Sequence, residues 1–154
     1  MSTLIILLLS IWSTGAIAAP STAKVNLEEG LWRLSMEMEI PGKVPDTGPL
    51  RRDICLRPDE VANLTAPPNS PCIVSGLEIT TRRMNWKVTC EQGQMRSSGV
   101  GIMEFGGREL SSALVIKTAE PYAMTIKQSM TGSRIGPCPP GTATGATPLR
   151  RYGK

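Results

Sequence analysis

The sequence contains no histidine, and this absence excludes several kinds of chemistry at once. A Ser-His-Asp or Cys-His catalytic group is impossible, as are metal sites with imidazole ligands and a histidine switch near neutral pH. Aromatic residues make up only 4% of the chain, so a platform that stacks bases or sugars would have few rings. The 154 residues suit one domain of ordinary size.

Long apolar runs are also scarce. The one such run, broken only by Ser10, extends from Leu4 to Trp12 and precedes an A-x-A sequence that ends at Ala18. This pattern predicts a signal peptide over residues 1–18, because the run is well short of the ~20 residues that a membrane-spanning helix needs. No later stretch is long and apolar enough to span a bilayer, so we expect a periplasmic or secreted protein with no transmembrane segment after signal removal.

Alternation with a period of two dominates the chain after residue 27 and predicts β-strands. Pro58, followed by two acidic residues, predicts a short helix over residues 56–64. We therefore expect an all-β domain over residues 19–138, with a single antiparallel sheet curled into a meander or barrel-like shape. The predicted strands cover residues 32–40, 50–56, 73–80, 84–89, 98–105, 109–118 and 122–135.

Residues 139–154 have a different composition, rich in Pro, Gly, Thr and Ala, and we expect a disordered basic tail. All 13 acidic residues but only 14 of the 17 basic ones precede Cys138. The net charge of the predicted domain is therefore close to zero, and nucleic-acid binding loses its main support. The pairs Arg51-Arg52 and Arg82-Arg83 are expected to be solvated loop charges.

The four cysteines, Cys55, Cys72, Cys90 and Cys138, predict two disulfides in an oxidising compartment. Their spacings include no C-x-x-C and match no zinc module. In a simple meander the first three would lie at one end of the sheet and Cys138 at the other, which is incompatible with bridges that need Cα atoms within about 7 Å. The path of the second or the last strand must differ from a simple meander, and the pairing stays open.

Methionine is the most notable residue on the predicted inward faces. These side chains can fill a core, bind Cu(I) through their thioethers, or line a cavity for an apolar ligand. Core packing is the favoured interpretation, and we expect neither a metal nor a cofactor. The residues that would face a ligand are Trp32, Met36, Met38, Trp86, Met124 and Met130.

One pair of carboxylates raises the question of catalysis. Glu37 and Glu39 lie two residues apart on one strand, and glycosidases use two carboxylates across a cleft. These two are expected on the polar, solvated face of the strand, opposite the apolar set. With this pair on the solvated face, we expect that the protein is not an enzyme.

Several short motifs occur in an order that resembles a known family. Gly30-Leu31-Trp32 begins the first strand, Cys55-Leu56 leads into a Pro-Asp-Glu turn, Trp86-Lys87-Val88 precedes Cys90, and Arg134-Ile135-Gly136 precedes the last cysteine. Over roughly residues 27–138 the chain resembles the bacterial exported proteins catalogued as domain of unknown function 3617. Pro137 stands where that family usually has an acidic residue. The resemblance implies a small periplasmic domain and no established activity.

These observations together favour a non-catalytic binding or scaffold module of the cell envelope that engages an unknown envelope protein. The alternative is a carrier that holds an apolar small ligand within a Met-rich β interior. A carrier needs a cavity on the order of several hundred cubic ångströms, whereas a scaffold has a packed core.

Overall fold

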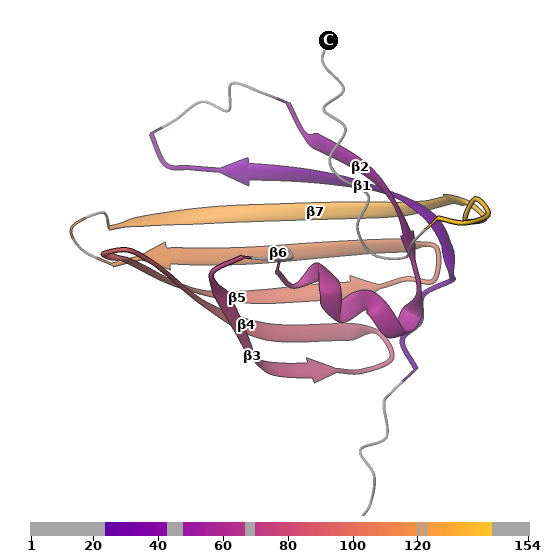
Figure 1. Cartoon of the computed structure of the whole chain (residues 1–154), viewed down its shortest axis with the longest axis horizontal. Helices are drawn as coiled ribbons and strands as arrows, with labels where there is room; N and C mark the ends of the chain where they lie inside the picture. Colours follow the sequence, from indigo (N-terminus) through magenta and orange to yellow (C-terminus); the bar gives the residue numbers. More distant parts are fainter. Residues whose placement is uncertain (1–23, 43–47, 67–69, 120, 122, 143–154) are drawn as a thin grey trace, which may run out of the picture.

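The computed structural model describes residues 24–42, 48–66, 70–119, 121 and 123–142. The predicted signal peptide and most of the predicted tail lie outside these residues. Within them, the expected all-β class with one antiparallel sheet and one short helix is confirmed (Figure 1). The elements are β1 (Gly30–Glu39), β2 (Leu50–Leu56), the 3-10 helix η1 (Pro58–Leu64), β3 (Cys72–Ile79), β4 (Arg83–Gln92), β5 (Met95–Phe105), β6 (Glu109–Thr118) and β7 (Met124–Gly136).

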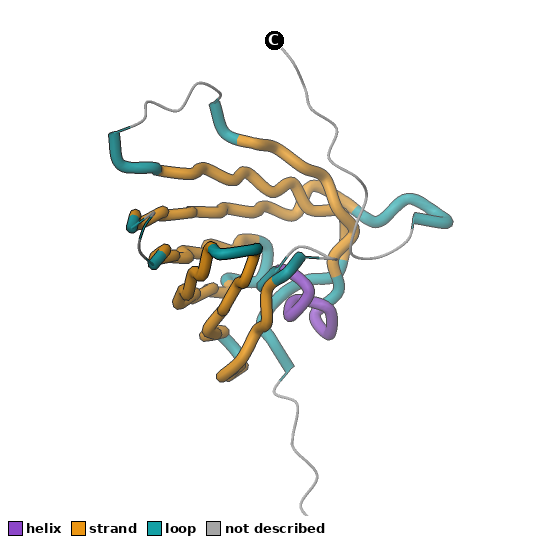
Figure 2. The backbone as a smooth tube through the Cα atoms, turned by 60° about the vertical axis from the view of Figure 1, so that its left-hand side comes forward, coloured by secondary structure: helices purple, strands orange, loops and turns teal. Residues whose placement is uncertain are grey.

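The strands do not follow a simple meander. The order across the sheet is β2-β1-β7-β6-β5-β4-β3, so β3 to β7 form consecutive hairpins while β1 pairs with β7. Strands β2 and β3 are the two edges, and the sheet is curled but not closed (Figure 2). The chain therefore travels from one edge of the sheet to the other between Leu56 and Cys72.

This crossing corrects the expected placement of the cysteines. Strand β2 ends where β7 ends, because Leu31 of β1 pairs with both Cys55 and Gly136. Cys55 therefore bonds to Cys138 at one end of the sheet, and Cys72 bonds to Cys90, its direct partner on β4, at the other end. The expectation that Cys55, Cys72 and Cys90 share one end was wrong, since the segment between β2 and β3 runs along the length of the sheet.

The segment that makes this crossing contains η1, which covers part of one sheet face. Pro58 occupies the first helical turn, where its missing N–H has no intrahelical partner to lose, as the sequence predicts. Val61 packs into the core from the helix. In Figure 1, η1 lies over β4 and β5 toward the right-hand end of the strands. In the described part of the chain, no helix has the length and apolarity needed to cross a membrane.

The face that η1 partly covers, here called the inner face, carries the core. Trp32 and Leu34 on β1 and Ile54 and Leu56 on β2 are buried by alternation, while Arg33 and Asp53 between them point to the opposite, outer face. Val25 and Leu27 before β1 and Val61 on η1 also belong to the core, and strands β4 to β7 contribute seven further residues. These residues are Met84, Trp86, Val88, Met103, Phe105, Leu110 and Met130.

Strand β5 has an inner face that its sequence leaves ambiguous, because glycines alternate with apolar residues. Cross-strand pairing settles this: Gly101 lies opposite Trp86, and Met103 lies opposite Met84, on the inner face. A Cβ atom on Gly101 would overlap the indole of Trp86. The glycine is therefore required by the close approach of a neighbouring ring, and a short residue there marks an inward position.

Candidate functional site

The six residues predicted to face a ligand all share the inner face, but they divide into two groups. Trp32, Trp86 and Met130 are buried core residues, and Trp32 is 0% exposed. Its indole Nε1–H donates a hydrogen bond to the carbonyl oxygen of Glu28 at 3.0 Å. Met36 is half-buried, whereas Met38 and Met124 are 48% and 43% exposed. The first group supports the fold, and the second remains accessible.

The accessible group belongs to a largely apolar surface, here called the open inner face. Leu50 pairs with Met36 across β2 and β1, and Met38 lies in one row with Leu114 through Gln128 of β7. Leu50 is 39% exposed although it shares a face with buried Ile54. The open inner face consists of Met36, Met38, Leu50, Leu114, Met124 and Ile126.

The inner face therefore changes character along its length. At the end where β1 begins, η1 and the strands enclose the core, and Trp32 and Ile54 have almost no exposed surface. At the end where β1 finishes, the left-hand end in Figure 1, η1 does not extend over β1 and β7. In the described part of the chain, no helix covers the apolar side chains of the half that carries Met38 and Met124. Contiguous exposed apolar surface of this kind is typical of a binding site.

One cationic residue lies at the boundary between the core and the open inner face. Arg52 pairs with Leu34, and it lies between Leu50 and Ile54 on the same side of β2. Arg52 as a whole is only partly exposed, and its Nε atom is buried without a hydrogen-bond partner. The expectation that Arg51 and Arg52 are loop charges was wrong: both belong to β2, where they point to opposite faces. Period-two alternation could have identified Arg52, since the inward positions of this strand are otherwise apolar.

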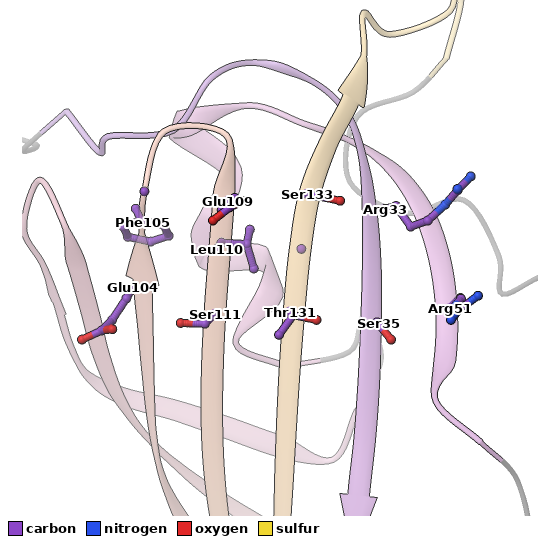
Figure 3. Close-up of a pocket in the computed structure, with 12 residues that line it drawn as sticks. Arg33, Ser35, Arg51, Glu104, Phe105, Glu109, Leu110, Ser111, Thr131 and Ser133 are labelled. Carbon is purple, nitrogen blue, oxygen red and sulfur yellow. The ribbon is translucent and has the colours of Figure 1, made fainter.

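The outer face contains a second candidate, a shallow recess of about 710 Å³ that is open to solvent. Short hydroxyl side chains occupy its centre, because Ser35, Thr131 and Ser111 are neighbours across β1, β7 and β6. Figure 3 shows them in a row between Arg51 on one side and Glu104 on the other. The depression follows from side-chain length, with short residues between long ones. Its hydroxyl groups can donate and accept hydrogen bonds.

The charges beside this recess are mostly paired. The Arg83 guanidinium donates to Glu104 at 2.6 Å, and Arg33 donates from two nitrogens to the two carboxylate oxygens of Asp53 at 2.9 Å each. Glu37 and Glu39 are exposed on the same face, and Glu39 lies 3.8 Å from the Lys127 ammonium. Within the described ranges, His, Cys, Asp and Glu side chains form no group of three that could hold a metal ion.

The pair of Arg33 and Asp53 predicts a pH-dependent contribution to stability. Hydrogen bonds from Arg33 lower the pKa of Asp53, partial burial opposes this shift, and the positive charge of Arg33 adds to it. A carboxyl with a lowered folded pKa stabilises the protein above the unfolded pKa, and this contribution is lost as pH falls through the folded value. We expect Asp53→Asn to lower the free energy of unfolding at neutral pH by less than about 1 kcal/mol, because the pair is solvent-exposed.

Urea unfolding at two pH values checks this prediction. The difference between wild type and Asp53→Asn should be present near pH 7 and should disappear near pH 2, well below the ordinary carboxyl pKa of about 3.9. Glu37→Gln, which removes an exposed carboxylate from the same face, is the matched control. A deficit of equal size at both pH values would contradict an ionic origin.

Comparison with known proteins identifies the family of this chain. The model of the family described as protein of unknown function DUF3617 matches residues 27–138, and the chain belongs to that family. No curated protein and no solved structure matches the chain. The matched range begins just before β1 and ends at Cys138, so it includes every strand and both disulfides.

Proposed function

We propose that the chain is an exported, non-catalytic binding domain of the cell envelope, and that the open inner face is its binding surface. One observation carries this proposal. The apolar inner face continues beyond the packed core to Met38, Leu50 and Met124, whose exposed fractions are between 39% and 48%. A sheet that leaves several large apolar side chains uncovered on the face of its core has a surface suited to an apolar partner.

The sequence and the cysteine pairs support export. An apolar run followed by an A-x-A sequence ends at Ala18, which is typical of a cleaved signal peptide. All four cysteines form disulfides. Structural disulfides persist in oxidising compartments, and the periplasm is one of these.

The partner can be of two kinds. An envelope protein that lays an apolar segment on the open inner face would make this domain a scaffold or interaction module. A small apolar ligand on the same face would make it a carrier. Methionine suits either role, because its unbranched and polarisable side chain adapts to different partners.

Binding of a neutral apolar dye tests the proposed surface. Nile red should bind the mature wild-type protein with an increase in fluorescence. The double variant Met38→Gln/Met124→Gln should bind about tenfold more weakly, which corresponds to roughly 60 Å² of lost apolar contact. Both residues are exposed, so the free energy of unfolding should change little.

The matched control places the same substitutions on the outer face. Ile73 and Val100 are 73% and 59% exposed on the opposite side of the sheet. Ile73→Gln/Val100→Gln should bind the dye as wild type does. Wild-type affinity in the Met38→Gln/Met124→Gln variant, or equal losses in both double variants, would overturn the proposed surface.

A further inference from the structure

Arg52 differs from Arg33 and Arg83, two other strand arginines, in having no carboxylate partner on an adjacent strand. On the outer face, Arg33 and Arg83 each meet a carboxylate on an adjacent strand, at 2.9 and 2.6 Å. Arg52 lies on the inner face, where its partner on β1 is Leu34. Among the residues that the structure describes, it forms no ion pair, and its buried Nε has no hydrogen-bond partner. Arg51, next to it, is exposed on the outer face.

An unpartnered guanidinium N–H group beside a hydrophobic core has a clear chemical preference. A buried donor without an acceptor is costly, and a guanidinium recovers most when its acceptor is a planar anion such as a carboxylate. The apolar neighbours of Arg52 in the sheet, Leu34 on β1 and Leu50 and Ile54 on β2, supply no such acceptor. A ligand that carries an anionic head group would therefore gain the most by placing it here.

The apolar surface that begins beside Arg52 is long. Along β7, inward-facing positions continue from Gly132, in the row of Arg52, through Met130, Gln128 and Ile126 to Met124. Eight residues of strand correspond to about 26 Å at roughly 3.3 Å per residue. Met36 and Met38 line the adjacent positions on β1. The described part of this surface is thus elongated and largely apolar, with the positive charge of Arg52 at one end.

We propose that the open inner face binds one long-chain fatty acid, with its carboxylate on Arg52 and its alkyl chain along Met36, Met38 and Met124. The proposal rests on the proposed function, and it names the ligand class and the residue that recognises the head group. The charge of the head group matches Arg52, and the flexible thioethers accommodate an alkyl chain without a fixed shape. The ligand is a single molecule and not a bilayer surface.

A pair of probes that differ only in the head group tests the role of Arg52. Cis-parinaric acid carries a carboxylate, and its methyl ester has the same chain without the charge. Wild type should bind the acid more tightly than the ester. Arg52→Gln should weaken binding of the acid about ten- to a hundredfold and leave the ester unchanged, because only the charge-assisted hydrogen bonds are lost. Arg52→Lys should retain part of the preference for the acid.

Arg51→Gln is the matched control, since it removes the same charge from the adjacent residue on the outer face. Its preference for the acid should equal that of wild type. Equal affinity of wild type for the acid and the ester would overturn the proposal. This comparison needs no variant, so the proposal can be tested even if Arg52→Gln does not fold. Arg52-dependent binding to phosphatidylglycerol vesicles, with no binding of the monomeric acid, would overturn it in favour of a membrane surface.

The same measurements separate the two proposals. If Met38→Gln/Met124→Gln weakens binding of Nile red and of the ester while Arg52→Gln leaves the preference for the acid unchanged, the surface is correct and the fatty-acid assignment is wrong. If neither variant changes any affinity, the binding surface itself is wrong.

Discussion

Replacing Cys55 and Cys138 with serine should lower the free energy of unfolding by about 4.5 kcal/mol, whereas replacing Cys72 and Cys90 should lower it by about 3 kcal/mol. The bridges close loops of very different length, because their sequence separations are 83 and 18. A cross-link that closes the longer loop removes more conformational entropy from the unfolded chain. The larger loss is comparable to the whole stability of a small domain, so the Cys55→Ser/Cys138→Ser variant should be marginally stable.

Equilibrium urea unfolding of the two double variants checks the order. Each variant keeps one native bridge, so each serves as the control for the other. The Cys72–Cys90 bridge joins directly opposed residues on neighbouring strands, while Cys55–Cys138 ties an edge strand to the segment after β7. A greater loss in Cys72→Ser/Cys90→Ser would contradict the loop-length argument.

Gly101→Ala should be among the most destabilising single-methyl additions in this protein. The added Cβ would occupy the space of the Trp86 indole, which is buried against β5. Neither the β5 backbone nor the ring can shift to make space, because both are packed in the core with Met84, Val88 and Met103. Overpacking of this kind typically costs about 1–3 kcal/mol, and we expect a value at or above the upper end of that range.

Thermal and urea unfolding measure this effect, with Gly48→Ala as the matched control. Gly48 has no heavy atom within 4 Å of the added Cβ, so this substitution should be neutral or slightly stabilising. In the background of Trp86→Leu, Gly101→Ala should cost much less, because the conflicting ring is gone. An unchanged cost in that background would show that the glycine is required by the backbone and not by the ring.

Much of the fold could be predicted from period-two alternation, for a simple physical reason. In a strand whose one face is buried, apolar residues must recur at every second position, as Trp32, Leu34 and Met36 do. The short helix was predictable from a different local rule, because a proline such as Pro58 is tolerated in the first turn of a helix and not in its interior. Alternation does not specify which strands become neighbours, so the pairing of β1 with β7 and the disulfide connectivity could not be obtained in this way.

The candidate site was only partly predictable. Alternation places Met38 and Met124 on the inner face together with Trp32, but it gives no information on how far along the sheet η1 extends. Trp32 is therefore buried while Met38 and Met124 are exposed, although the sequence places all three on the same face. Arg52 was missed because it was assigned with Arg51 as a charged pair, although adjacent residues of a strand face opposite sides. The outer recess depends on the neighbour relation of β1, β7 and β6, which is a property of the tertiary structure.

The pairing of the first strand with the last one imposes an order on folding during synthesis. Strands β3 to β7 are consecutive hairpins and can assemble as they emerge, with Cys72 and Cys90 oxidised early because they are close in sequence. Strand β1 pairs with β2 and β7, and this second partner is available only after β7 has emerged. The hairpin of β1 and β2 must therefore wait, and formation of the Cys55–Cys138 bridge reports that the domain has been completed.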